Sequence, residues 1–191
     1  MLSTIYIRVA DWNSKRYERQ YNHEMSCHLF FEEYWEFFDA GGEQVEELDA
    51  LCDMIYVGFG ILWKLNLTNE QLDQAMADGR EGMVRIMETN LFPPVIAMSS
   101  MFMSFQHDDD TALTSGIAAC IWLALAQMLA MGLTQEQCEE ALLIVCDSND
   151  TKTVVKSKPN EDAKDGAKGA LFVDPKPKLR KLLEKVNVHL H

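Results

Sequence analysis

Proline and glycine, which break helices and shape tight turns, are scarce in this sequence. Its 191 residues contain 5 prolines and 10 glycines, and no proline occurs in residues 1–92. A fold built from many short strands needs frequent turns, so this scarcity favours helices over a turn-rich β-fold. Hydrophobic residues make up 48% of the chain, which is enough to bury a core and argues against a wholly disordered protein.

Cysteine motifs and targeting signals are also missing. The five cysteines are odd in number, lie in apolar stretches and include no Cys-x-x-Cys pair. We therefore expect buried free thiols in a reducing compartment rather than a disulfide framework or a cysteine-based zinc site. The first residues lack the basic and then apolar pattern of a signal peptide. The most apolar stretch, residues 117–133, contains Gln127, so we predict a buried core helix, no membrane span and a cytoplasmic protein.

Positive charge is rare outside the C-terminal part of the chain. The formal net charge is −13, and residues 151–191 contain 10 lysines and arginines against 5 aspartates and glutamates. This balance of +5 in the tail leaves −18 on residues 1–150. An acidic body repels nucleic-acid phosphate, so we expect no nucleic-acid partner. An acidic body with a basic tail suits a metal site that binds a phosphorylated small molecule together with the tail lysines. The alternative is that the acidic surface is simply solvated and the tail is loosely ordered.

The sequence resembles itself at an offset of 66 residues. Residues 67–75 and 133–141 share five of nine amino acids. Each segment follows a long apolar stretch and a short break, and begins an amphipathic stretch with an N-capping threonine. We interpret this pattern as an ancestral duplication, with one repeat over about 10–82 and the other over about 83–148.

The hydrophobic periodicity predicts an all-α fold. Residues 1–150 are expected to form a single helical domain made of the two repeats, and residues 151–191 a basic tail that is extended over 151–178 and helical over 178–186. The expected helices lie near 10–22, 24–40, 44–65 and 68–80 in the first repeat, and near 84–106, 111–131 and 134–147 in the second.

Acidic residues recur at helical spacing within two apolar stretches. Glu32 and Glu36 are four residues apart and share a helix face, as do Asp49 and Asp53, and Glu33 lies three residues before Glu36. Aromatic residues flank the first set and aliphatic residues the second, so both faces are expected to turn partly inward. Carboxylates that face one another in a core are costly without a cation, and hard oxygen ligands suit Mg²⁺ or Mn²⁺. The alternative is that one or two of these acids face solvent.

The second repeat has lost all five acids while keeping the apolar frame. At the 66-residue offset they are replaced, in order, by Met98, Ser99, Phe102, Ser115 and Ala119. Met, Phe and Ala cannot bind a hard cation. We therefore expect one metal site in the first repeat and a degenerate second repeat that contributes packing.

The acidic stretches resemble the all-α nucleoside triphosphate pyrophosphohydrolases, the superfamily of MazG, dimeric dUTPases and phosphoribosyl-ATP pyrophosphohydrolase. Their hallmark is an ExxE helix followed by an ExxD helix. Glu33-Tyr-Trp-Glu36, with Glu32 before it, fits the first motif. Ala50-Leu-Cys-Asp53 fits the second, except that Ala50 replaces the leading acid, for which Asp49 is the nearest substitute.

The tail resembles the same family, whose "SNxxK … KG" segment helps to hold the triphosphate. Ser148-Asn-Asp-Thr-Lys152 and Lys168-Gly-Ala-Leu-Phe172 fit that segment. The resemblance therefore implies phosphate binding by Asn149, Lys152 and Lys168.

The resemblance also implies a MazG-like helical bundle and the Mg²⁺-dependent hydrolysis of a (deoxy)nucleoside triphosphate to its monophosphate and pyrophosphate. Such bundles are often formed by two subunits, so the duplicated chain would act as a monomeric pseudo-dimer (a fused dimer) or as a homodimer of such units. The metal ligands would be Glu32, Glu33, Glu36, Asp49 and Asp53, with Glu33 and Glu36 as catalytic acids and Glu33 orienting or deprotonating the attacking water. The base needs an aromatic and amide pocket; its candidates, for most of which core packing is the alternative role, are Trp12, Asn13, Tyr17, Tyr21 and Asn22.

Two other classes of helical protein compete with this assignment. A di-iron carboxylate bundle needs Glu-x-x-His pairs, and no histidine stands three residues after a glutamate, which argues against that class. The alternative that stays open is a non-catalytic duplicated bundle that binds a nucleotide or a protein partner. Eleven methionines, several of them in residues 98–103, suit either a partner surface or a flexible core.

Overall fold

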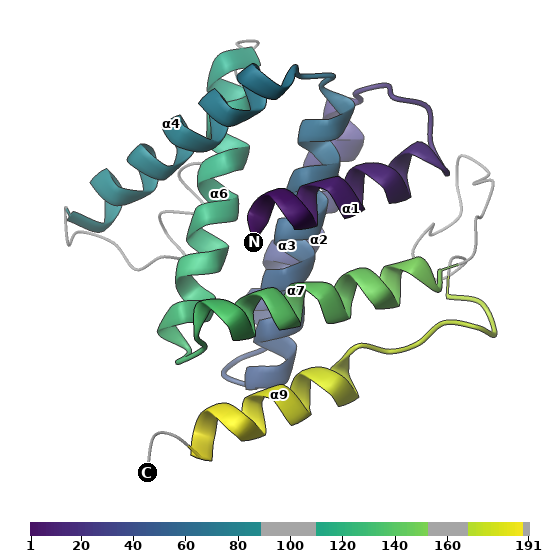
Figure 1. Ribbon diagram of the computed structural model, residues 1–191, viewed down its shortest axis with the longest axis vertical. Coiled ribbons are helices and arrows are strands. Elements are labelled where there is room, and N and C mark those ends of the chain that lie inside the picture. Colours follow the sequence, from purple (N-terminus) through teal and green to yellow (C-terminus); the bar gives the residue numbers. More distant parts are fainter. Residues whose placement is uncertain (89–109, 153–167, 189–191) are drawn as a thin grey trace.

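The computed structural model describes residues 1–88, 110–152 and 168–188. Within these ranges the chain forms seven helices and no strand (Figure 1), which confirms the predicted all-α class. The helices are α1 (Leu2–Ser14), α2 (His23–Asp39), α3 (Gln44–Lys64), α4 (Asn69–Glu88), α6 (Asp110–Ala130), α7 (Gln135–Asp150) and α9 (Lys176–Val188).

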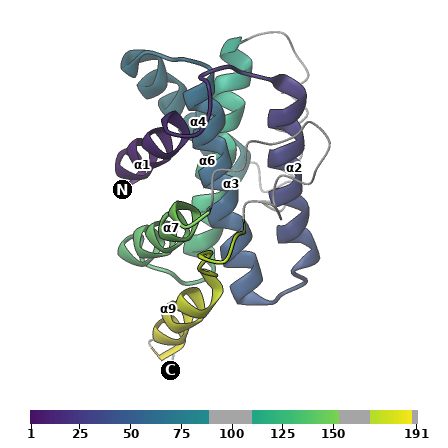
Figure 2. The same ribbon diagram turned by 90° about the vertical axis from the view of Figure 1, so that its right-hand side faces the viewer.

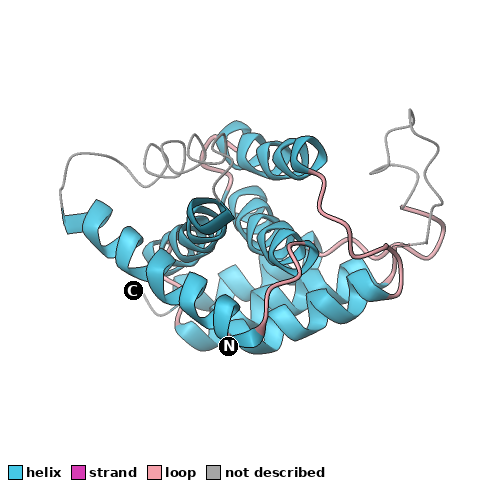
Figure 3. Cartoon of the chain, turned by 90° about the horizontal axis from the view of Figure 1, so that it is seen from above, coloured by secondary structure: helices cyan, strands magenta, loops and turns pink. Residues whose placement is uncertain are grey.

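The central helix of the fold is α3. Helix α2 packs along one side of it, and α1, α7 and α9 cross the opposite side (Figure 2). Helix α6 runs beside α3, and α4 packs on α6. The view from above shows helices on several sides of a shared interior (Figure 3). Because α3 is covered from several directions, almost every residue from Leu48 to Trp63 is buried, as a near-continuous apolar helix requires.

The apolar helix α6 satisfies the length and hydropathy of a membrane span over Thr111–Ala130, and 67% of its apolar window is buried inside the protein. Its neighbours α3 and α4 supply that cover. This burial of α6 agrees with the core helix that the sequence predicts for this stretch.

The prediction for the first helix is wrong. Helix α1 spans Leu2–Ser14 rather than 10–22, because Ile5, Val9 and Asn13 form its buried stripe at helical spacing. Residue Asn22, which was assigned to the end of that helix, instead caps α2: its side-chain oxygen accepts a hydrogen bond from the Met25 backbone nitrogen at 2.9 Å. The terminal helix also begins two residues earlier than predicted, at Lys176, where Pro177 in the first turn needs no backbone partner.

Helix α4 continues to Glu88, so the break predicted between residues 80 and 84 is also wrong. Contact with α6 keeps this glycine-containing stretch helical. A Cβ atom at Gly79 would lie 2.6 Å from the Ala118 Cβ and 2.6 Å from the Ala119 nitrogen, so only glycine permits this approach of the two backbones. The rest of the helix predicted over 84–106 lies outside the described residues.

Substituting Gly79 by alanine is expected to destabilise the protein. The added methyl group meets backbone atoms that cannot move aside, so we expect a loss of about 3 kcal/mol and a Tm lowered by roughly 5–10 °C in thermal unfolding. Gly60→Ala is the matched control, because a Cβ there would meet nothing nearer than the Asn13 side-chain nitrogen at 3.5 Å. Equal Tm values for the two variants would contradict this packing.

Where both repeats are described, the helix boundaries follow the 66-residue offset. The bounds of α3, Gln44–Lys64, map onto 110–130, which are the bounds of α6. The equivalent residues Asn66 and Gly132 both have positive φ, 58° and 94°. Helices α4 and α7 both begin after a threonine that exchanges hydrogen bonds with the glutamine three residues on, Thr68 with Gln71 and Thr134 with Gln137. The fused-dimer bundle stays a prediction, because residues 89–109 lie outside the described part of the chain.

Candidate functional site

Asp49 and Asp53 lie one turn apart on α3, on a face that meets the C-terminal tail. The side chain of Asp49 is 14% exposed, and its neighbours Leu48 and Ala50 are buried. Burial, and then the negative charge of Asp53, raise the pKa of Asp49 to about 7, although the Lys176 ammonium lowers it. Two aspartates at this spacing repel each other, so the pair is better suited to a cation than to an empty site.

The oxygens of Asp49 differ in their surroundings. Oδ1 is buried and has no hydrogen-bond partner among the described residues. Oδ2 lies 3.9 Å from the Nζ atom of Lys176, which is also 2.5 Å from the Oε2 atom of Glu46. A buried carboxylate oxygen without a partner is costly, and a metal ion would satisfy it.

Asp49→Asn tests this cost without any metal present. The pKa of Asp49 is raised from 3.8 to about 7 by folding, so the carboxyl group favours the folded state below pH 4 and loses that contribution as the pH rises through 7. In EDTA at pH 8 the variant is therefore expected to be more stable than the wild type, by on the order of 3 kcal/mol. The difference should shrink towards pH 4 in urea titrations. Asp73→Asn, at an exposed acid of α4, controls for the loss of one negative charge. A pH-independent difference would refute this assignment.

The three predicted acids of α2 have different environments. Glu33 is 3% exposed and lies on the buried face that includes Phe30 and Phe37. Glu32 is partly exposed, with Oε1 3.7 Å from the His28 Nε2 atom, and Glu36 is exposed. Among the described residues, no group of three or more His, Cys, Asp or Glu side chains is arranged to hold a metal ion. The five-carboxylate site therefore stays a prediction, of which the structure brings Asp49 and Asp53 together and turns Glu33 inward.

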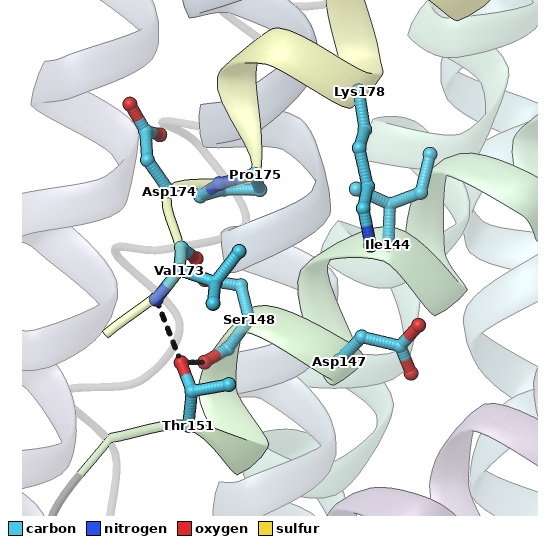
Figure 4. A pocket seen from close by; sticks show the side chains of 8 residues that line it. All are labelled: Ile144, Asp147, Ser148, Thr151, Val173, Asp174, Pro175 and Lys178. Atoms are coloured by element: carbon cyan, nitrogen blue, oxygen red, sulfur yellow. Dashed lines mark hydrogen bonds between the residues drawn. The ribbon is translucent and has the colours of Figure 1, made fainter. Parts of the chain in front are cut away.

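The end of α7 binds the backbone of the tail. The Ser148 hydroxyl donates to the Val173 carbonyl oxygen at 2.7 Å. The Val173 N–H donates to the Thr151 hydroxyl at 2.9 Å (Figure 4). We call these two bonds the tail latch. Beside it lies a pocket of about 150 Å³ (Figure 4), smaller than the 300 Å³ or more typical of ligand sites, which is lined by Ile144, Asp147, Ser148, Thr151, Val173, Asp174, Pro175 and Lys178.

The three predicted phosphate-binding residues have different settings. Asn149 is buried, and its amide donates to the Val145 carbonyl oxygen at 3.1 Å, so its side chain is used within α7. Lys152 is half-buried just after α7, and Lys168 is exposed. The lysine that the structure places beside Asp49 is Lys176, which sequence analysis did not select. The only feature of the sequence that could have pointed to Lys176 is its position just before the periodic apolar residues of the terminal helix.

The candidates for the base pocket fall into two groups. Trp12 contacts Tyr17 with a ring-centroid distance of 5.7 Å, and the Arg16 guanidinium lies 4.4 Å from the Trp12 ring centroid. Asn13 is buried and donates to Val9 O at 2.8 Å, a packing role. Asn22 caps α2 as described above, and the Tyr21 hydroxyl lies 2.8 Å from the His23 Nδ1 atom. The structure thus leaves Trp12 and Tyr17 as the paired aromatic candidates.

Tyr56 is a residue that sequence analysis missed. It lies three residues after Asp53 on α3, and its ring contacts the Trp12 ring edge to face at 5.8 Å. Its hydroxyl is buried and has no hydrogen-bond partner among the described residues. Burial, and then nearby acidic groups, raise the pKa of this hydroxyl well above its usual value, so it stays protonated and can donate. Tyr56 therefore connects the Trp12 ring of α1 with the aspartates of α3.

Comparison of the chain with protein-family models, with curated proteins and with solved structures gives no significant match.

Proposed function

We propose that the protein is a Mg²⁺-dependent pyrophosphohydrolase that converts a (deoxy)nucleoside triphosphate to its monophosphate and pyrophosphate in the cytoplasm. The observation that carries the proposal is the Asp49–Asp53 pair on a buried helix, with one buried carboxylate oxygen that has no hydrogen-bond partner in the described chain. Such a pair calls for a hard cation. Lys176 of the basic tail lies 3.9 Å from Asp49, and the other lysines of the tail would supply the positive charge that a triphosphate requires.

The residues would divide the reaction among them. Asp49 and Asp53, together with Glu32, Glu33 and Glu36, would hold Mg²⁺ or Mn²⁺, which polarises phosphate oxygens and spreads their negative charge. Glu33 is the most enclosed of the three α2 acids, so it is our choice for orienting or deprotonating the attacking water, with Glu36 beside it on the same helix.

The remaining part of the substrate would contact the tail and α1. Lys152 and Lys168 would neutralise the outer phosphates. Asn149 would donate a hydrogen bond to them through the second N–H of its amide, since the first donates to the Val145 carbonyl oxygen. The Trp12 and Tyr17 rings would stack on the base, since their ring centroids lie 5.7 Å apart. The Trp12 Nε1 atom donates to the Asn149 carbonyl oxygen at 2.9 Å, which links this pair to the end of α7. With the acids in one repeat only, we propose one nucleotide per chain and a chain that works as a monomeric pseudo-dimer or as a homodimer of such units.

A pyrophosphate-release assay over the common ribonucleoside and deoxyribonucleoside triphosphates tests the proposal. At least one substrate should yield equimolar monophosphate and pyrophosphate with Mg²⁺ or Mn²⁺. Excess EDTA should stop the reaction without unfolding the protein, as followed by circular dichroism, and added Mg²⁺ should restore it. Undiminished turnover in excess chelator would remove the metal mechanism.

An exposed aromatic face on α2 favours the alternative, a non-catalytic bundle that binds a partner. Trp35 and Phe38 are 55% and 54% exposed, and Phe31, on the same face, is 36% exposed. An apolar surface of this kind is common at protein contacts. Under this alternative no triphosphate is hydrolysed. Binding of a protein partner or of a nucleotide, measured by sedimentation or by titration, should then be weakened by Trp35→Ser and Phe38→Ser.

A further inference from the structure

Lys176 is the one described lysine in an ion pair with the acidic face of α3. Its Nζ atom lies 2.5 Å from Glu46 Oε2 and 3.9 Å from Asp49 Oδ2. The hydrogen bond to Glu46, and then the charge of Asp49, raise the pKa of Lys176, so the ammonium is charged at neutral pH. It is therefore a cation held against one of the two aspartates proposed to bind metal.

The backbone on both sides of Lys176 is anchored. Three residues before it, Val173 exchanges two hydrogen bonds with the end of α7 in the tail latch. The backbone N–H of Lys176 donates to Asp174 Oδ1 at 3.0 Å. Three residues after it, Leu179 is fully buried in the core. Because both flanks are fixed, the ammonium can move only by rotation of its own side chain.

The electrostatics of the pair explain why a lysine is present there. Asp49 is enclosed, close enough to Asp53 to feel its charge, and also affected by Glu46 and Asp174. A metal-free site with this many acids would be destabilised by their mutual repulsion. A tethered ammonium reduces that repulsion, but it binds as a compact, strongly hydrated charge that a divalent ion can replace.

We propose that the Lys176 ammonium occupies the cation position beside Asp49 in the metal-free protein, and that a divalent cation displaces it on binding. This inference rests on the metal site of the proposed function and adds a competition between that metal and a residue of the same chain. The displaced ammonium stays within one side-chain length of the metal, since its backbone is anchored. Phosphate oxygens brought by the metal are then the nearest new anionic partners for it.

Two measurements test the competition without using turnover. First, amine-reactive labelling of the wild-type protein, read by mass spectrometry, should show Lys176 protected in EDTA and labelled several-fold faster at saturating Mn²⁺. Lys178, which is exposed on the same helix, should label at the same rate in both conditions. Second, Lys176→Met should bind Mn²⁺ about tenfold more tightly than the wild type, within the usual range for coupling between binding events, as measured from the free-ion signal in electron paramagnetic resonance. Lys178→Met is the matched control and should bind like the wild type.

The outcomes separate this inference from the proposed function. If Mn²⁺ binds to wild type and Lys176→Met with equal affinity, or more weakly to the variant, the displacement is wrong and the metal site stands. The displacement is also wrong if Mn²⁺ does not change the rate at which Lys176 is labelled. This result comes from the wild-type protein, so it holds even if Lys176→Met does not fold. If neither protein binds Mn²⁺, the metal site of the proposed function fails, and the displacement fails with it.

Discussion

Asp53→Asn should reduce kcat for triphosphate hydrolysis by at least about 100-fold, because a neutral amide cannot replace a carboxylate that helps to hold the metal, a contribution of several kcal/mol. Asp53 is half-buried on α3, between the buried residues Cys52 and Met54. Glu36→Gln should also abolish turnover, since the proposal makes Glu36 a ligand as well as a catalytic acid. Steady-state pyrophosphate release at saturating Mg²⁺ measures both effects.

Stability distinguishes a catalytic acid from a structural one. The charge of Asp53 raises the pKa of Asp49, so removing it relieves repulsion, and metal-free Asp53→Asn should melt no lower than the wild type. Asp73→Asn, an exposed substitution on α4, should keep full turnover and an unchanged Tm. An inactive Asp53→Asn that also melts well below the wild type in EDTA would mean that this carboxylate supports the fold rather than the chemistry.

Deleting α9 should unfold the protein or make it insoluble. The helix buries Leu179, Leu182, Leu183 and Val186, each 5% exposed or less, against α3 and α7. Truncating one such leucine to alanine costs about 2–5 kcal/mol, and the loss of all four approaches or exceeds the 5–15 kcal/mol that stabilises a typical domain. Soluble expression and thermal unfolding of a chain that ends at Pro175, which keeps the tail latch, measure the effect.

Single substitutions resolve how much of this effect comes from packing. Leu179→Ala should lower the free energy of unfolding by about 3 kcal/mol, whereas Lys181→Ala, at an exposed position of the same helix, should change it by less than about 0.5 kcal/mol. A chain without α9 that remains folded with an unchanged Tm would show that α9 is an appendage of the bundle and not part of its core.

Much of the fold could be predicted from local sequence. The scarcity of proline and glycine and the apolar periodicity gave the all-α class, and the bounds predicted for α2, α3 and α7 differ from the observed ones by at most three residues. Thr68 and Thr134 were recognised as N-caps because a cap depends on residues adjacent in sequence. Helix α1 was misplaced because its buried stripe, Ile5 and Val9, is too short to dominate the periodicity of a polar neighbourhood.

For the candidate site, too, only the features set by neighbouring residues could be predicted from the sequence. The spacing of Asp49 and Asp53 fixes their common helix face, and that face is half-buried on the side where Lys176 of the tail lies. Their environment was not predictable, since the orphaned Oδ1 atom and the enclosed Tyr56 hydroxyl depend on α1, α7 and α9 crossing α3. The sequence-based choice of Asn149 as a phosphate ligand did not anticipate that its amide bonds to the Val145 carbonyl oxygen.

The sequence by itself determined the helical class, the positions of the acids along two helices and the separation of an acidic body from a basic tail, because each depends on composition or on spacing within a few turns. Only the tertiary structure decided which basic residue meets which acid. Lys176 reaches Glu46 across 130 positions of the chain, because the tail latch on α7 and the buried leucines of α9 carry it there. No local pattern encodes such a contact, since it is fixed by the packing of three helices that are distant in sequence.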